Sequence, residues 1–161
     1  MKPATWRLPL TLYTTLALAL VLMLLPMPEW AEPWRPHWLA LALAYWTLAL
    51  PERCGLAHAW ILGLCLDTLQ DRLLGHSAFV LTLLAWLVLH EHRRLRMYSF
   101  MHQSLLLGIA LAVIPLATGW LRGLTGHPPH VYNTLPAAFS TLLLWPLAFI
   151  VLRDLRRRAS R

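Results

Sequence analysis

The 161-residue sequence is poor in charged residues. Asp, Glu, Lys and Arg make up 13% of it, about half of the roughly 25% that soluble domains carry. Hydrophobic residues make up 58%. This balance excludes a soluble domain. Because a transmembrane helix uses roughly 20 apolar residues, six such helices would fill most of the chain and leave no room for a soluble catalytic domain.

Cysteine is equally scarce, with Cys54 and Cys65 as the two examples. Their separation corresponds to about 16 Å along a helix, whereas a disulfide needs Cα atoms within roughly 7 Å. The sequence therefore predicts no disulfide between them. We expect both side chains to behave as small hydrophobes, buried or facing lipid.

Catalytic patterns are also missing. The sequence has no G-x-S-x-G motif and no serine with an obvious base. Asp67 and Asp71 share a helix face at i, i+4, but Asp71-Arg72 resembles a solvated turn. The glutamates are expected in loops rather than as a membrane-embedded pair. The sequence therefore predicts that the protein is not an enzyme. These glutamates are Glu29, Glu32, Glu52 and Glu91.

The eight histidines form no recognisable metal or haem site. No pair has the i, i+4 or HExxH spacing that zinc prefers, and none is clearly matched in membrane depth for haem ligation. We interpret them as solvated interfacial side chains and predict no metal and no cofactor. They are His37, His58, His76, His90, His92, His102, His127 and His130.

Six apolar segments follow one another along the chain. A strand would leave its backbone unpaired in lipid, so each segment is predicted to be a helix. The expected fold is an all-α membrane protein, a compact bundle of six transmembrane helices. We expect one integral-membrane domain, residues 1–161, with a basic cytoplasmic tail at 153–161. The predicted spans are 8–27, 33–50, 56–69, 73–89, 100–121 and 131–152.

The net charge of +7 is clustered beside the ends of the hydrophobic segments rather than spread over a basic face. This pattern suits membrane orientation better than nucleic-acid binding. With the N-terminus inside, eleven Lys and Arg residues fall on inside segments and three, Arg35, Arg72 and Arg122, on outside loops. Six spans with both termini in the cytoplasm are therefore predicted.

Asp67 is the most informative single residue, because a carboxylate within a membrane span is costly. Ala59, Gly63 and Asp67 fall at i, i+4 and i+8, a face of small residues that lets another helix approach closely. Three interpretations stay open: internal helix packing, contact with a partner, and proton or ion chemistry. We expect internal packing, so that Gly63→Leu lowers the amount of folded protein and Asp67→Asn is tolerated.

Two basic clusters are predicted to contact anionic lipid headgroups, or alternatively a cytoplasmic protein. The first lies in the loop after the fourth span, and the second lies in the C-terminal tail. Their residues are Arg93, Arg94 and Arg96, and Arg156, Arg157 and Arg158.

Ordered motifs along nearly the whole chain resemble the MreD family of bacterial cell-shape proteins. The stretches Arg35-Pro36-His37-Trp38 and Tyr45 to Arg53 resemble the family signature RPxW…YWxLALPxR. Gly63, Asp67 and Gly75 resemble its G-x-x-x-D…G segment. The second stretch includes Trp46 and Pro51, and the further motif positions are Gln103, Trp145 and Pro146.

The resemblance implies a non-enzymatic inner-membrane scaffold that supports lateral-wall peptidoglycan synthesis and rod shape. It implies binding to the single-span protein MreC and an indirect link to MreB and the RodA–PBP2 synthase. The family is also similar in fold to the substrate-binding subunits of energy-coupling-factor transporters. That similarity gives the alternative hypothesis, a small-solute or vitamin-like binding subunit.

Overall fold

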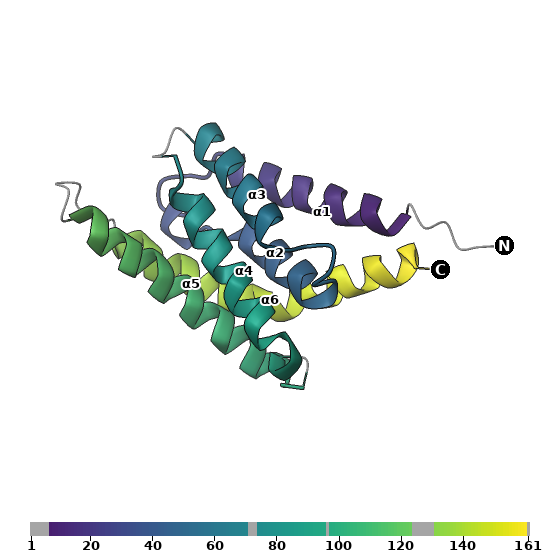
Figure 1. The fold of residues 1–161 in the computed structure, drawn as a ribbon. Coiled ribbons are helices and arrows are strands. Elements are labelled where there is room, and N and C mark those ends of the chain that lie inside the picture. The colour runs from purple at the N-terminus through teal and green to yellow at the C-terminus, as the bar shows by residue number, and fades with distance from the viewer. Residues whose placement is uncertain (1–6, 71–73, 96, 124–130, 161) are drawn as a thin grey trace.

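A computed structural model describes residues 7–70, 74–95, 97–123 and 131–160. These residues form six α-helices and one 3₁₀ turn, and they contain no strand. The helices are α1 (Arg7–Leu24), α2 (Trp38–Ala49), α3 (Leu56–Leu69), α4 (His76–Leu95), α5 (Phe100–Gly123) and α6 (Val131–Ala159), and the turn is η1 (Glu32–Trp34) (Figure 1).

Each helix overlaps one of the predicted apolar segments. α4 continues beyond the predicted limit of 89 to Leu95, so Glu91, Arg93 and Arg94 lie in this helix and not in a loop as expected.

The second helix begins later than expected. Residue 33 belongs to η1, and α2 starts at Trp38. Pro36 explains the delay, because a residue before proline avoids helical backbone angles. Arg35 is accordingly extended, with φ −60° and ψ 116°.

The last helix is longer than the predicted span. α6 continues to Ala159 and includes Pro136 and Pro146 in its interior. The basic residues expected in a separate tail therefore extend the helix itself. Cations at a helix C-terminus also interact favourably with its dipole.

α2 forms the centre of the bundle. Every residue from Leu39 to Leu48 is buried, and α1, α4 and α6 pack around this helix. A helix that is apolar on all sides is expected to be enclosed. The indole Nε1 of Trp46 donates to Thr15 Oγ1 at 2.8 Å, which ties α2 to α1.

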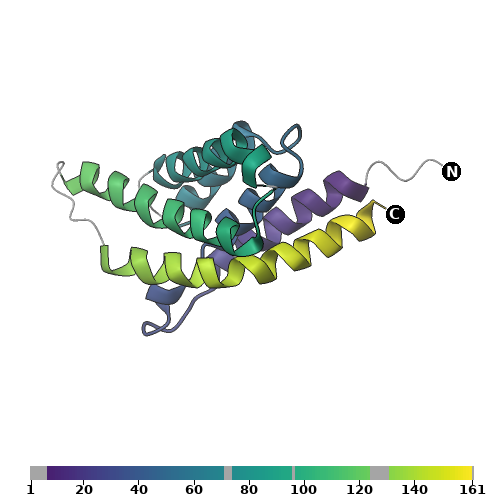
Figure 2. The same ribbon diagram turned by 90° about the horizontal axis from the view of Figure 1, so that it is seen from below.

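Two helix pairs complete the structure. α3 packs along α4, and α5 packs along α6. Figures 1 and 2 show both ends of the described chain at the same end of the bundle, beside the C-terminal part of α6. We call this the terminal end of the bundle.

The outside of the bundle is apolar. Large exposed hydrophobic side chains cover α1, α5 and α6. Among the described residues, two segments are by themselves long and apolar enough to cross a membrane, Arg7–Leu24 and Leu135–Ala159. Leu56–Leu69 and Met101–Leu111 are shorter apolar segments.

Candidate functional site

Asp67 lies at the end of α3 and caps the beginning of α4. Its side chain is fully buried. One carboxylate oxygen accepts from the Gly75 N–H at 2.8 Å, and the Ser77 N–H lies 3.0 and 3.1 Å from the two oxygens. The first N–H groups of a helix lack partners and carry partial positive charge, so a carboxylate stabilises them. The acid is thus fully engaged in joining α3 to α4.

Gly63 permits close contact between the same two helices. A Cβ at this position would lie 2.2 Å from Ala78 Cα and 2.4 Å from Ala78 N. These are backbone atoms, which cannot move aside as a flexible side chain can. Ala59, one turn earlier on α3, is also fully buried. The face predicted from Ala59, Gly63 and Asp67 therefore lies against α4 of the same chain.

Gly75 turns the chain between the two helices. Its φ is +96°, a conformation that residues with a Cβ rarely adopt. Gly63, Asp67 and Gly75 therefore act together in one structure, which we call the α3–α4 hairpin. Asp71, considered as a carboxylate partner of Asp67, lies outside the described residues, as does Arg72.

The carboxylate geometry changes one expectation. Asp67→Asn was expected to be tolerated because it keeps the shape of the side chain. Both oxygens of Asp67 face backbone N–H groups, so an asparagine would turn its NH₂ toward a donor and leave a buried group without an acceptor. We now expect this substitution to be destabilising.

Arg35 has a structural role that the charge count did not indicate. Its Nη1 donates to the carbonyl of Met23 at 2.8 Å, and its Nη2 donates to the carbonyl of Leu25 at 2.9 Å. These carbonyls lie at the end of α1, where helical partners run out. Gln70 Nε2 also donates to Met23 O at 3.3 Å. Arg35 and Gln70 thus hold the end of α1.

The basic clusters are mostly exposed. Arg93 and Arg94 lie in the last turn of α4, and Arg94 lies 3.6 Å from the carboxylate of Glu91. Arg157 and Arg158 are exposed on α6, whereas Arg156 is half-buried. Arg96 lies outside the described residues. The three C-terminal arginines therefore differ in their surroundings.

Other motif positions support the core. Pro36 and Trp145 are buried, Pro51 and Pro146 are half-buried, and Arg53 is exposed. The Tyr45 ring packs edge-on against Phe149 at 5.3 Å between centroids, and Trp145 lies 5.9 Å from Phe149. The contact between Tyr45 and Phe149 joins α2 to α6, and the contact between Trp145 and Phe149 lies within α6.

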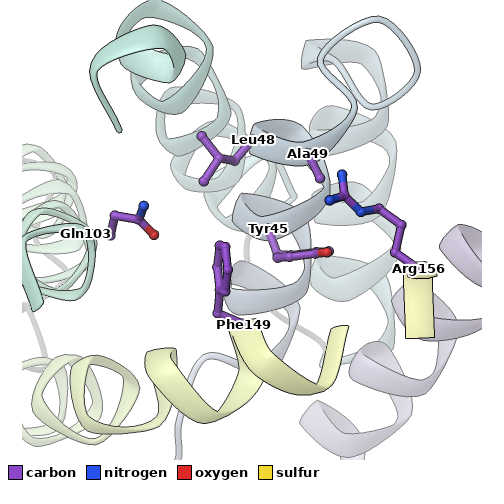
Figure 3. A pocket seen from close by; sticks show the side chains of 6 residues that line it. All are labelled: Tyr45, Leu48, Ala49, Gln103, Phe149 and Arg156. Carbon is purple, nitrogen blue, oxygen red and sulfur yellow. The ribbon is translucent and has the colours of Figure 1, made fainter. Parts of the chain in front are cut away.

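A pocket of about 380 Å³ lies between the C-terminal part of α2, the start of α5 and the C-terminal part of α6. Tyr45, Leu48 and Ala49 from α2, Gln103 from α5, and Phe149 and Arg156 from α6 line it. In Figure 3, Gln103 approaches from one side and Arg156 from the other, with Tyr45 and Phe149 between them. Residues from three helices thus line one cavity, which we call the α2–α5–α6 pocket.

Gln103 is held firmly in this pocket. Its Nε2 donates to the carbonyls of Leu95 at 2.7 Å and Tyr98 at 3.2 Å. Because both contacts are made by Nε2, they fix the orientation of the amide, and Oε1 points away from the Leu95 and Tyr98 carbonyls. The buried Gln103 Oε1 and the buried Tyr45 hydroxyl have no hydrogen-bond partner among the described residues.

The two cysteines are free and have different surroundings. Cys54 is buried between α2 and α3, and Cys65 is exposed on α3. Burial raises the pKa of the Cys54 thiol, and a hydrogen bond from Thr47 partly opposes this effect. Within the described part of the chain, no three His, Cys, Asp or Glu side chains are grouped as a metal site would require.

Sequence reasoning did not identify the pocket as a site. Tyr45 and Gln103 were recognised as motif positions, but nothing in their spacing indicated that they meet. Arg156 was recognised as one of several basic residues. A half-buried arginine beside apolar wall residues becomes distinguishable from its exposed neighbours once the helices are placed in space.

Comparison with known proteins identifies the family. The family described as "rod shape-determining protein MreD" matches residues 6–155. The "Rod shape-determining protein MreD" of Haemophilus influenzae is 32% identical over 151 residues, which cover 93% of each chain. No solved structure matches the chain. The sequence, with its apolar helices, therefore belongs to the MreD family of rod shape-determining membrane proteins.

Proposed function

We propose that the protein is a non-enzymatic scaffold of the rod-elongation complex in the bacterial inner membrane. It binds the single-span protein MreC and, through it, supports MreB and the RodA–PBP2 synthase in lateral-wall peptidoglycan synthesis. The family match over residues 6–155 carries this proposal. The proposed mechanism is lateral packing of a bundle helix against the membrane span of the partner.

The outer face of α6 supports this mechanism. Leu135, Phe139, Leu143 and Leu147 follow one another at intervals of four, and each is more than half exposed. Residues four apart lie on the same side of a helix, so they form a continuous apolar ridge. A single apolar helix of a partner fits such a ridge through van der Waals contact in the membrane.

Two experiments test the scaffold. Affinity purification from native membranes should recover MreC, and Leu143→Trp on the ridge should reduce this recovery while the protein still accumulates. The control is Leu18→Trp, which makes the same substitution at an exposed leucine on α1, away from the ridge. Depletion in a rod-shaped host should give round cells. Rod-shaped cells after depletion would contradict the proposed function.

We also propose six membrane crossings with both termini in the cytoplasm. The charge split of eleven to three supports this topology, and the position of both chain ends at the same end of the bundle agrees with an even number of crossings. In a background without Cys54 and Cys65, Ser160→Cys should resist a membrane-impermeant thiol reagent in intact cells. Glu29→Cys, exposed in the loop after α1, should react. Labelling of Ser160→Cys would contradict the topology.

The alternative is a vitamin-like solute-binding subunit with a fold similar to that of energy-coupling-factor subunits. The α2–α5–α6 pocket is the observation that favours it, because about 380 Å³ is within the size range of small-molecule sites. Equilibrium binding of membrane-permeable vitamins to the purified protein distinguishes the two hypotheses. Saturable binding in the pocket without MreC recovery would favour the alternative.

A further inference from the structure

We propose that the α2–α5–α6 pocket binds the phosphoglycerol headgroup of an anionic lipid from the adjacent leaflet. The site is built from the Tyr45 hydroxyl, the Gln103 amide oxygen and the Arg156 guanidinium. The proposal deepens the scaffold function, since it rests on the same membrane placement. It assigns a specific lipid site to one arginine of the basic C-terminal cluster.

The charge of the pocket favours an anion. Arg156 lines the pocket, and Arg153 and Arg157 lie within one turn of it on the same helix. Within the described residues, none of these three arginines lies within 4 Å of a carboxylate. A guanidinium matches a phosphate geometrically, with paired N–H donors facing two oxygens. The cations therefore provide one half of the recognition.

The unpaired oxygens provide the other half. Tyr45 is 1% exposed and Gln103 4% exposed, yet the Tyr45 hydroxyl and Gln103 Oε1 lack a hydrogen-bond partner within the described chain. Buried polar atoms are almost always paired in folded proteins. The tyrosine hydroxyl can donate to a phosphate, but the amide oxygen can only accept. A ligand that satisfies the site must therefore combine an anionic group with a hydrogen-bond donor.

The position of the pocket favours a lipid as the source of this ligand. The C-terminal end of α2, the first turn of α5 and the C-terminal part of α6 line the pocket together. The proposed topology places all three of these helix ends on the cytoplasmic side of the membrane. Leu48, Ala49 and Phe149 give the same pocket apolar walls. Clustered arginines at the end of a membrane helix are suited to headgroup contact. Phosphatidylglycerol has a phosphate and free hydroxyls, whereas phosphatidylethanolamine has a donor but no net negative charge.

The test uses the purified full-length protein and native mass spectrometry of retained lipids. The protein is reconstituted in nanodiscs of phosphatidylcholine containing either phosphatidylglycerol or phosphatidylethanolamine. We expect selective retention of phosphatidylglycerol. Arg156→Gln should lower it about tenfold, the change that the loss of one charge-assisted hydrogen bond produces. Arg158→Gln, an exposed arginine two residues later, is the matched control and should retain the lipid.

Tyr45→Phe is the second variant, because it removes a single hydroxyl and keeps the aromatic packing. It should also lower retention, so the proposal stays testable if Arg156→Gln does not fold. Equal losses in Arg156→Gln and Arg158→Gln would overturn the site in favour of general surface attraction. Equal retention of phosphatidylethanolamine would overturn the choice of headgroup. Binding of soluble glycerol 3-phosphate without lipid selectivity would overturn the lipid source.

These outcomes are separate from those of the scaffold proposal. Lipid retention is measured on the purified protein without any partner. Recovery of MreC is measured from native membranes with the wild-type chain. Lipid retention with no MreC recovery would contradict the scaffold, and MreC recovery with no lipid selectivity would contradict the headgroup site.

Discussion

The α3–α4 hairpin and the α2–α5–α6 pocket both gather polar motif residues inside an apolar bundle, but they use them differently. In the hairpin, both oxygens of Asp67 accept backbone hydrogen bonds and Gly63 lies against the backbone of Ala78. In the pocket, the buried Tyr45 hydroxyl and Gln103 Oε1 lack partners in the described chain, and the half-buried Arg156 lines the same pocket. The comparison indicates that the polar groups of the hairpin are used within the fold, whereas those of the pocket are the groups proposed to bind a ligand.

Gly63→Leu should have the largest effect on this comparison. The new side chain would collide with the backbone of Ala78, so the free energy of unfolding should fall by about 3 kcal/mol, the upper end of what overpacking costs. The measurement is the amount of monodisperse protein extracted from membranes. Gly55→Leu is the control, because Gly55 has no described neighbour within 4 Å of the Cβ position. Equal yields of the two variants would show that the close contact is incidental.

Asp67→Asn should have the second-largest effect. An unpaired buried donor costs about 1–3 kcal/mol, so the thermal midpoint of the purified protein should fall clearly. Asp154→Asn, at an exposed position on α6, makes the same chemical change where no backbone group depends on it. An unchanged midpoint in Asp67→Asn would restore the original expectation that this substitution is tolerated.

Gly75→Ala should destabilise the hairpin more moderately. The positive φ of Gly75 costs a residue with a Cβ about 1–2 kcal/mol. No described atom lies within 4 Å of the added Cβ, so backbone strain is the whole of the expected effect. The same thermal measurement applies, with Gly55→Ala as the control. A larger loss than that of Asp67→Asn would reverse the expected order.

Tyr45→Phe should have the smallest effect on stability. Because the hydroxyl has no described partner, its removal leaves no protein group unsatisfied, and the free energy of unfolding in lipid-free detergent should change by less than about 0.5 kcal/mol. Asp67→Asn differs, because it alters a carboxylate that accepts hydrogen bonds from backbone N–H groups. A loss as large as that of Asp67→Asn would remove the distinction between the two regions.

The helices could be predicted because long apolar runs have one dominant explanation. The central place of α2 could not be predicted in the same way. Lipid and protein interior are similarly apolar, so the sequence of a buried helix resembles that of a lipid-facing one. The proline-delayed start of α2 at Trp38 was also missed, although Pro33 and Pro36 were visible.

The two sites differ in how much the sequence revealed. Ala59, Gly63 and Asp67 lie on one helix, so their spacing predicted a close helix contact without naming the neighbour. Gly75 and Ser77 supply the partners of Asp67 after a turn whose backbone angles cannot be read from residue types. Tyr45, Gln103 and Arg156 come from three helices. Their meeting depends on how the whole bundle packs.

The enclosed position of α2 has a consequence for assembly during synthesis. Its 12 residues are about 18 Å long at 1.5 Å per residue, well short of the roughly 30 Å hydrocarbon thickness. The helix is therefore poorly matched to a bilayer on its own and depends on its neighbours for cover. α1 is synthesised before α2, whereas α4 and α6 are synthesised after it. Its side toward Phe149 stays uncovered until the final helix is made, so a chain truncated before α6 would present this side to chaperones and membrane proteases.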